Sequence, residues 1–83
     1  MTKAQIHDRL VATAKHYAWE DVELYMAEIG WDVDWMPDYV DDPDAEMLST
    51  EECRVINGIL LDAFEGAHKR RFTRREREYL LNR

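Results

Sequence analysis

The stretch from Leu48 to Ala67 constrains the fold most, because it joins a helix-start signal to a wide apolar face. Ser49 and Glu52 have the spacing of a capping box, and Leu48 can pack on Cys53 as a hydrophobic staple. Apolar side chains then recur at helical spacing over more than half of the circumference: Cys53, Val55, Ile56, Ile59, Leu60, Leu61, Ala63, Phe64 and Ala67. We therefore predict a central helix that neighbours contact from two sides.

Capping-box spacing occurs twice more, at Thr2 with Gln5 and at Thr73 with Glu76. After the first of these helix starts, the apolar pattern changes phase near residues 18–20, which predicts a break in the helix. Gly30 can end the helix that follows in the left-handed conformation. The predicted helices span about 3–17, 19–29, 50–70 and 74–82. No β-branched alternation is long enough for a sheet. The predicted fold class is therefore all-α, a small helical bundle of three long helices plus a short C-terminal helix, in a single domain over 1–83.

A long acidic connection, "WDVDWMPDYVDDPDAEM" at residues 31–47, separates two of the predicted helices. If "WDVDW" is extended, Trp31, Val33 and Trp35 point to one side and their aspartates to the other, so the tryptophans can seal the bundle. "DDPDAEM" has the pattern of a short helical turn, with Asp42 as its cap and Pro43 at its first position. Connections of this length in compact domains tend to be functional or mobile.

Composition restricts the class of protein. The chain has 83 residues, of which 46% are hydrophobic, enough for a modest core. Its single cysteine allows no intramolecular disulfide, and no apolar run approaches the roughly 18 residues of a membrane span. We expect a cytoplasmic protein without a membrane partner. The net charge of −7 argues against general affinity for nucleic acid or anionic membranes.

The charge is divided along the chain. Residues 1–52 hold 14 Asp and Glu against 3 Lys and Arg, whereas residues 53–83 hold 4 against 8. The two halves could neutralise one another within the fold, or they could pair head to tail between copies. A homodimer is therefore possible, also because the helix over 50–70 has apolar surface to spare.

No motif for catalysis, metal binding or cofactor binding is present. Neither Asp32 nor Asp34 starts a calcium loop, because glycine and glutamate are missing at the sixth and twelfth positions. The histidines have no metal-ligand spacing, and His7 falls in the apolar stripe of its helix, where we expect a hydrogen-bonded core or boundary residue. There is no phosphate-binding loop, and Cys53 is expected to be buried and inert. We predict that the protein is not an enzyme, with no metal and no cofactor.

A basic cluster lies near the C-terminal end: Lys69, Arg70, Arg71, Arg74, Arg75 and Arg77. It could contact phosphates, or it could serve the end of one helix and pair with the glutamates of the next. Residues 72–80, "FTRREREYL", resemble the opening of the first helix in LuxR-type helix-turn-helix domains, which often read LTxREREVL. The resemblance covers nine residues, and the five residues after Glu78 leave no room for a recognition helix. We interpret it as a capped helix.

The remaining candidate is an acidic surface for a basic partner. Many carboxylates in the first half can speed encounter with a positive groove, and an exposed Tyr39 or Met36 can supply a buried anchor. The predicted surface comprises Glu20, Asp21, Glu23, Asp32, Asp34, Asp38, Tyr39, Asp41, Asp42 and Asp44. Alternatively, the tryptophans only cover the core and the acids only keep the protein soluble.

These features predict a non-enzymatic protein-interaction module. By its class, a small acidic helical protein of this kind suggests a phage-like inhibitor that mimics nucleic acid, for instance an anti-restriction or anti-CRISPR candidate acting on a nuclease, polymerase or CRISPR effector. The alternative is a nucleic-acid-associated regulator or adaptor that uses the basic cluster. Of these two functions, we favour binding to a protein over direct binding to nucleic acid.

Overall fold

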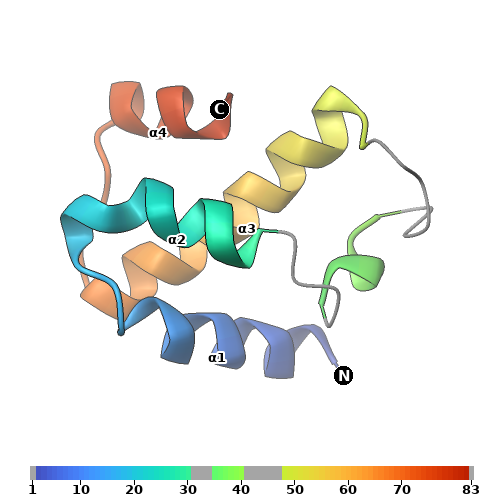
Figure 1. Cartoon of the computed structure of the whole chain (residues 1–83), viewed down its shortest axis with the longest axis horizontal. Helices are drawn as coiled ribbons and strands as arrows, with labels where there is room; N and C mark the ends of the chain where they lie inside the picture. Colours follow the sequence, from blue (N-terminus) through green and yellow to red (C-terminus); the bar gives the residue numbers. More distant parts are fainter. Residues whose placement is uncertain (1, 31–34, 41–47, 83) are drawn as a thin grey trace.

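The computed structural model describes residues 2–30, 35–40 and 48–82 (Figure 1). These residues form four α-helices and two 3₁₀ turns, and no strand occurs among them, which confirms the all-α class. The elements in chain order are α1 Lys3–Ala14, η1 Trp19–Asp21, α2 Val22–Ile29, η2 Met36–Asp38, α3 Thr50–His68 and α4 Arg74–Leu81. The molecule measures 33 × 26 × 18 Å.

All three predicted capping boxes are present. The side-chain oxygens of Thr2, Ser49 and Thr73 accept hydrogen bonds from backbone amides three residues later, at 3.2, 3.1 and 3.2 Å. The side chains of Gln5, Glu52 and Glu76 in turn accept the amides of the capping residues. Each box therefore satisfies two backbone donors that the helix itself leaves free.

The helix lengths differ from the prediction of three long helices. α3 has 19 residues and α1 has 12, but α2 and α4 have 8 each. The first helix ends at Ala14 instead of residue 17, because the amides of His16 and Tyr17 bond three residues back and Ala18 is extended. The predicted break near residues 18–20 is confirmed, and it begins a few residues earlier than expected.

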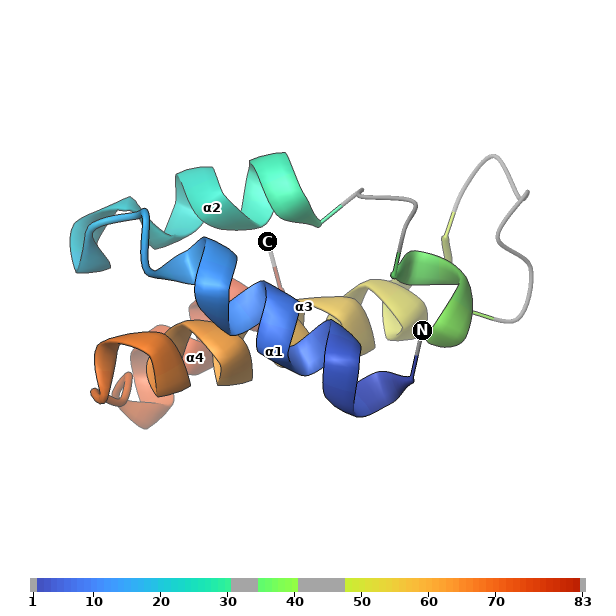
Figure 2. The same cartoon turned by 90° about the horizontal axis from the view of Figure 1, so that it is seen from below.

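The central position of α3 is confirmed, since α1, α2 and α4 all contact it (Figures 1 and 2). Its apolar face is continuous with buried side chains from the other helices and from residues 35–40. The core consists of Ile6, Leu10, Ala14, Val22, Tyr25, Met26, Trp35, Met36, Val40, Ile56, Leu60, Leu61, Ala63, Phe64 and Leu80. No helix within the described ranges is both long enough and apolar enough to cross a membrane.

The expectation for Gly30 needs correction. Gly30 follows α2 with φ −56° and ψ −28°, so it is right-handed. Glycine is needed there because a Cβ would lie 2.5 Å from the Met26 carbonyl oxygen. In α3, a Cβ added at Gly58 would lie 3.7 Å from Leu81 of α4, whereas a Cβ added at Gly66 would meet nothing within 4 Å. The left-handed residue is Lys69, with φ 51°, and it ends α3 at His68 rather than at residue 70.

Trp35 fastens the described part of the connection to the bundle. Its side chain is 2% exposed, and its Nε1 donates a hydrogen bond to the Ile29 carbonyl oxygen at 3.2 Å. Pro37 lies in the 3₁₀ turn η2 that follows. The predicted role of Trp35 in covering the core is therefore confirmed. The alternation at Trp31–Asp34 and the turn predicted at Asp42 and Pro43 lie outside the described residues.

Candidate protein-interaction surface

The described members of the predicted acidic surface do not form one patch. Glu20, Asp21 and Glu23 are exposed at the start of α2, whereas Tyr39 follows η2, beyond the other end of α2 (Figure 1). The side chain of Asp38 lies outside the described residues, and so do Asp32, Asp34, Asp41, Asp42 and Asp44. The structure therefore gives the acidic surface only at α2.

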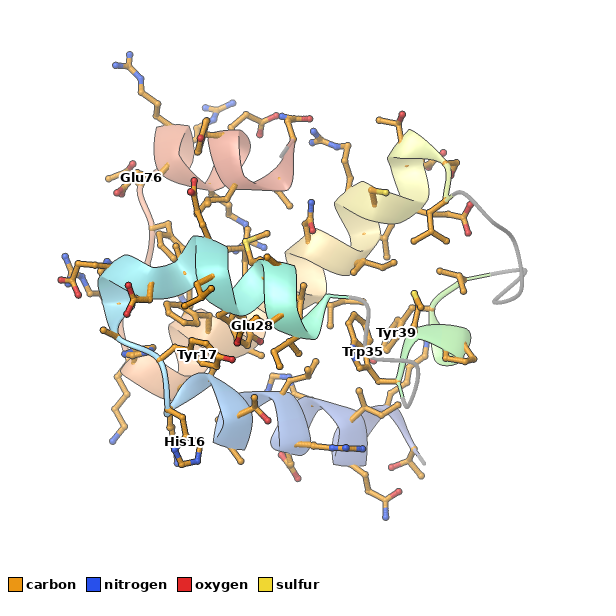
Figure 3. All side chains as sticks on the ribbon, in the orientation of Figure 1. His16, Tyr17, Glu28, Trp35, Tyr39 and Glu76 are labelled. Atoms are coloured by element: carbon orange, nitrogen blue, oxygen red, sulfur yellow. The ribbon has the colours of Figure 1, made fainter. Side chains whose placement is uncertain are left out.

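The expected anchors are packed into the fold. Met36 is 8% exposed. Tyr39 is half-buried, its ring lies edge-on to Trp35 at 5.8 Å, and Lys3 Nζ lies 5.2 Å from the ring centroid (Figure 3). The prediction that Tyr39 or Met36 is an exposed anchor is therefore wrong. Both side chains hold residues 35–40 against the bundle.

An exposed apolar side chain occurs instead on the outer side of α2. Leu24 is 52% exposed, because Val22, Tyr25 and Met26 take the buried positions of this short helix. Asp21, just before α2, and Glu28 are exposed, and at about 100° per residue both project within about 60° of Leu24 around the helix axis, with Glu28 toward α1. We call Asp21, Leu24 and Glu28 the α2 outer face.

The α2 outer face is strongly negative. No Lys or Arg occurs between Lys15 and Arg54, so α2 contains no cation of its own. Among the described residues, neither Asp21 nor Glu28 takes part in a salt bridge. Leu24 lies opposite the apolar stripe of α2, so helical periodicity in the sequence indicates that it is exposed. The predicted surface was chosen by charge instead and did not include Leu24.

Glu28 is held in place by Tyr17. The Tyr17 hydroxyl donates a hydrogen bond to a carboxylate oxygen of Glu28, and Figure 3 shows the two side chains meeting between α1 and α2. This hydrogen bond to Glu28 is the main cause that raises the pKa of Tyr17 above its ordinary value, and burial and the negative charge of Glu28 add to it. The hydrogen bond holds the Glu28 carboxylate of the α2 outer face in a fixed position.

Two members of the predicted basic cluster serve internal contacts. Arg77 donates to Asp62 at 2.7 Å and to Glu65 at 2.9 Å, which ties α4 to α3. The Arg70 guanidinium carbon lies 4.6 Å from the ring centroid of Trp19. The other four members are exposed: Lys69, Arg71, Arg74 and Arg75.

Trp19 has a larger role than the sequence indicated. Its ring stacks on Phe72 with centroids 4.2 Å apart, and Phe64 and His68 lie 5.6 and 5.8 Å away. His68 also approaches the Ala14 carbonyl oxygen, with Nε2 at 3.2 Å. Trp19 thus joins the start of α2 to the connection between α3 and α4. Glu20 and Glu23 of the first half of the chain line the same groove as Arg75 of the second half. The charge division along the sequence is therefore not a division in space at this end of the molecule.

A groove of about 580 Å³ separates the start of α2 from α4. We call it the α2–α4 groove. It is lined by Trp19, Val22, Phe72 and Leu80, with Glu20 and Glu23 on the α2 side and Arg75, Glu76 and Tyr79 on the α4 side. Tyr79 is 64% exposed, which is unusual for so large a ring.

The three histidines and the cysteine all lie in the described part of the chain. Within it, no three His, Cys, Asp or Glu side chains gather in a way that could hold a metal ion. Cys53 is half-buried rather than buried. His7 is exposed, contrary to the expectation of a core or boundary residue, because Ile6 and Leu10 take the buried positions of α1.

Comparison with protein-family models, with curated proteins and with solved structures found no match.

Proposed function

We propose that this chain is a non-enzymatic protein-interaction module that binds a basic protein surface through the α2 outer face. The observation that carries the proposal is the exposure of Leu24 between carboxylates. An apolar side chain that is desolvated at the centre of a contact supplies affinity, while a charged surround speeds encounter and selects the partner.

The surrounding sequence extends the negative charge. The stretch 16–53 contains 13 Asp and Glu and no Lys or Arg, and most of this stretch follows α2 in the sequence. An acidic stretch of this kind is complementary to the positive grooves with which proteins bind nucleic acid. We therefore propose a nucleic-acid-binding protein as the partner, for instance a nuclease, a polymerase or a CRISPR effector. Occupation of its groove would inhibit it by competition.

The alternative, a nucleic-acid-associated regulator that uses the basic cluster, has weaker support. Arg77 is engaged by two carboxylates and Arg70 lies against Trp19. A phosphate contact there would have to rely on the four remaining cations, in a molecule with a net charge of −7.

Affinity capture with matched variants tests the proposal. The test bait carries Asp21→Asn, Leu24→Ala and Glu28→Gln. The control bait loses the same number of charges and one exposed apolar side chain elsewhere, through Asp8→Asn, Glu51→Gln and Val55→Ala. Wild-type protein and control should recover the same nucleic-acid-binding protein from cell lysate in a salt-sensitive way, and the test bait should not.

Two further baits separate the alternatives. One carries Asn at 32, 34, 38, 41 and 42, which removes five of the acids that follow α2 in the sequence. The other carries Arg71→Gln, Arg74→Gln and Arg75→Gln. If the arginine variant alone loses the partner, the basic cluster is the functional surface and the proposal is wrong. If a duplex DNA competitor does not displace the partner protein from the wild-type bait, the partner is not held through its nucleic-acid groove.

A further inference from the structure

We propose that the α2–α4 groove is the contact surface between two copies of this chain, with Tyr79 of each copy seated in the groove of the other. The groove has an apolar floor, and the 64% exposed ring of Tyr79 lies at its edge. An apolar groove beside an exposed aromatic ring is a surface that remains incompletely covered in a single copy.

The two sides of the groove differ in charge, because a cation lines only the α4 side. On the α2 side, Glu20 is exposed in a segment without cations. On the α4 side, Arg75 lines the groove and Arg74 precedes it. Glu76 lies on that side too, but its carboxylate accepts the Thr73 amide at 2.9 Å in the capping box. The α4 side therefore offers the Arg75 guanidinium to a partner, and the α2 side offers the Glu20 carboxylate.

The second copy has the chemistry that this groove fits. An occupant needs an apolar ring together with a cation that can face Glu20. α4 itself presents that combination, because Arg75 and Tyr79 are four residues apart and share one side of the helix. Under two-fold symmetry the α4 side of each copy meets the α2 side of the other, so the same pair of contacts forms twice. A twofold contact thus satisfies both grooves at once.

The size of the surface predicts weak association. Stable complexes bury roughly 800 Å² on each partner, which would be about one seventh of the 5725 Å² exposed by this chain. α4 and α2 have eight residues each, so each is only about 12 Å long. The net charge of −7 further opposes pairing. We expect a dissociation constant on the order of 100 µM at moderate salt.

Sedimentation equilibrium of the purified chain, from about 10 µM to 1 mM, measures the association without any other partner. Wild-type protein should shift from monomer toward dimer. Tyr79→Ser should weaken association at least tenfold. Val55→Ser is the matched control, because Val55 is 47% exposed and does not line the groove, and it should leave association unchanged. A strictly monomeric wild type at 1 mM, or equal association of the two variants, overturns the proposal.

Charge reversal gives a sharper result. Glu20→Arg alone and Arg75→Glu alone should each be monomeric, since each brings like charges together across the twofold contact. A mixture of the two variants should form a heterodimer, because every contact in it then pairs opposite charges. If the mixture stays monomeric while circular dichroism shows both variants folded, Glu20 and Arg75 do not meet between copies, and the proposal is wrong. The α2 outer face is unchanged in these variants, so this test is independent of the proposed function.

Discussion

The Arg70 guanidinium lies over the ring of Trp19, with its central carbon 4.6 Å from the ring centroid. Trp19 in turn stacks on Phe72, which belongs to the same connection between α3 and α4 as Arg70. A cation that the sequence places in a basic cluster thus helps to fix the start of α2. The basic cluster thus has a partly structural role, which is why we propose α2 rather than the basic cluster as the partner surface.

Arg70→Ala should lower the free energy of unfolding by about 0.5–1 kcal/mol, as expected for loss of an exposed cation–π contact. Arg71→Ala removes the same charge from an exposed residue and should change stability by less than about 0.5 kcal/mol. Urea denaturation followed by tryptophan fluorescence measures both. Equal effects would show that net charge matters and that the contact with Trp19 does not.

Gly30 and Gly66 should respond oppositely to alanine. Gly30→Ala should destabilise the fold by about 1–3 kcal/mol, because its Cβ would lie 2.5 Å from the Met26 carbonyl oxygen. Gly66→Ala should stabilise the fold by about 0.5–1 kcal/mol, because Gly66 lies within α3 and has open space around it. Thermal unfolding of the two variants decides this. A neutral Gly30→Ala would mean that the end of α2 moves without cost.

Glu65 should contribute more to stability than Asp62, the second carboxylate that Arg77 contacts. Its two oxygens accept the Phe72 amide at 2.8 Å and the Arg77 guanidinium at 2.9 Å, and its side chain is 17% exposed. Glu65→Ala should cost about 1–3 kcal/mol, and Glu65→Gln should cost less because its amide oxygen can still accept the Phe72 amide. Asp62→Ala should cost less than about 1 kcal/mol, since that carboxylate is 63% exposed. Chemical denaturation that ranks Asp62→Ala above Glu65→Ala would contradict this assignment.

Tyr17 should titrate above its ordinary pKa of 10.0, because its hydroxyl donates to Glu28. A raised pKa in the folded state favours the neutral phenol. Its contribution to stability is therefore complete below the unfolded value and is lost as the pH rises through the folded pKa. Glu28→Gln should lower the pKa of Tyr17, as measured by tyrosinate absorbance. In a Tyr17→Phe background the same substitution should leave the titration unchanged, and a change there would assign the effect to another tyrosine.

Local signals were predictable from the sequence. Each capping box depends on residues three positions apart, and the wide apolar face over 53–67 identified α3 as the central helix. The early end of α1 was not predictable from local signals, and Trp19, which follows it, packs on Phe64 and Phe72, far away in the sequence. Residue type alone gave the wrong conformation for Gly30. Glycine is required there because the Met26 carbonyl oxygen lies close to it, and not because the backbone is left-handed.

The candidate site was predictable in part. Its charge could be counted from the sequence, and the start of α2 does present Glu20, Asp21 and Glu23 to solvent. The anchor could not be found by composition, because burial of Met36 and Tyr39 depends on the packing of Trp35 against the end of α2. Leu24 follows from the phase of α2 once the buried stripe of that helix is known.

Calorimetric titration of the captured partner with the α2 variants tests the central claim most directly. The triple variant with Asp21→Asn, Leu24→Ala and Glu28→Gln should bind at least tenfold more weakly than wild type, which corresponds to about 1.4 kcal/mol. The control with Asp8→Asn, Glu51→Gln and Val55→Ala should bind within about twofold of wild type, because exposed side chains outside a contact contribute little to affinity. Equal affinity of the two triple variants would show that the partner does not contact the α2 outer face.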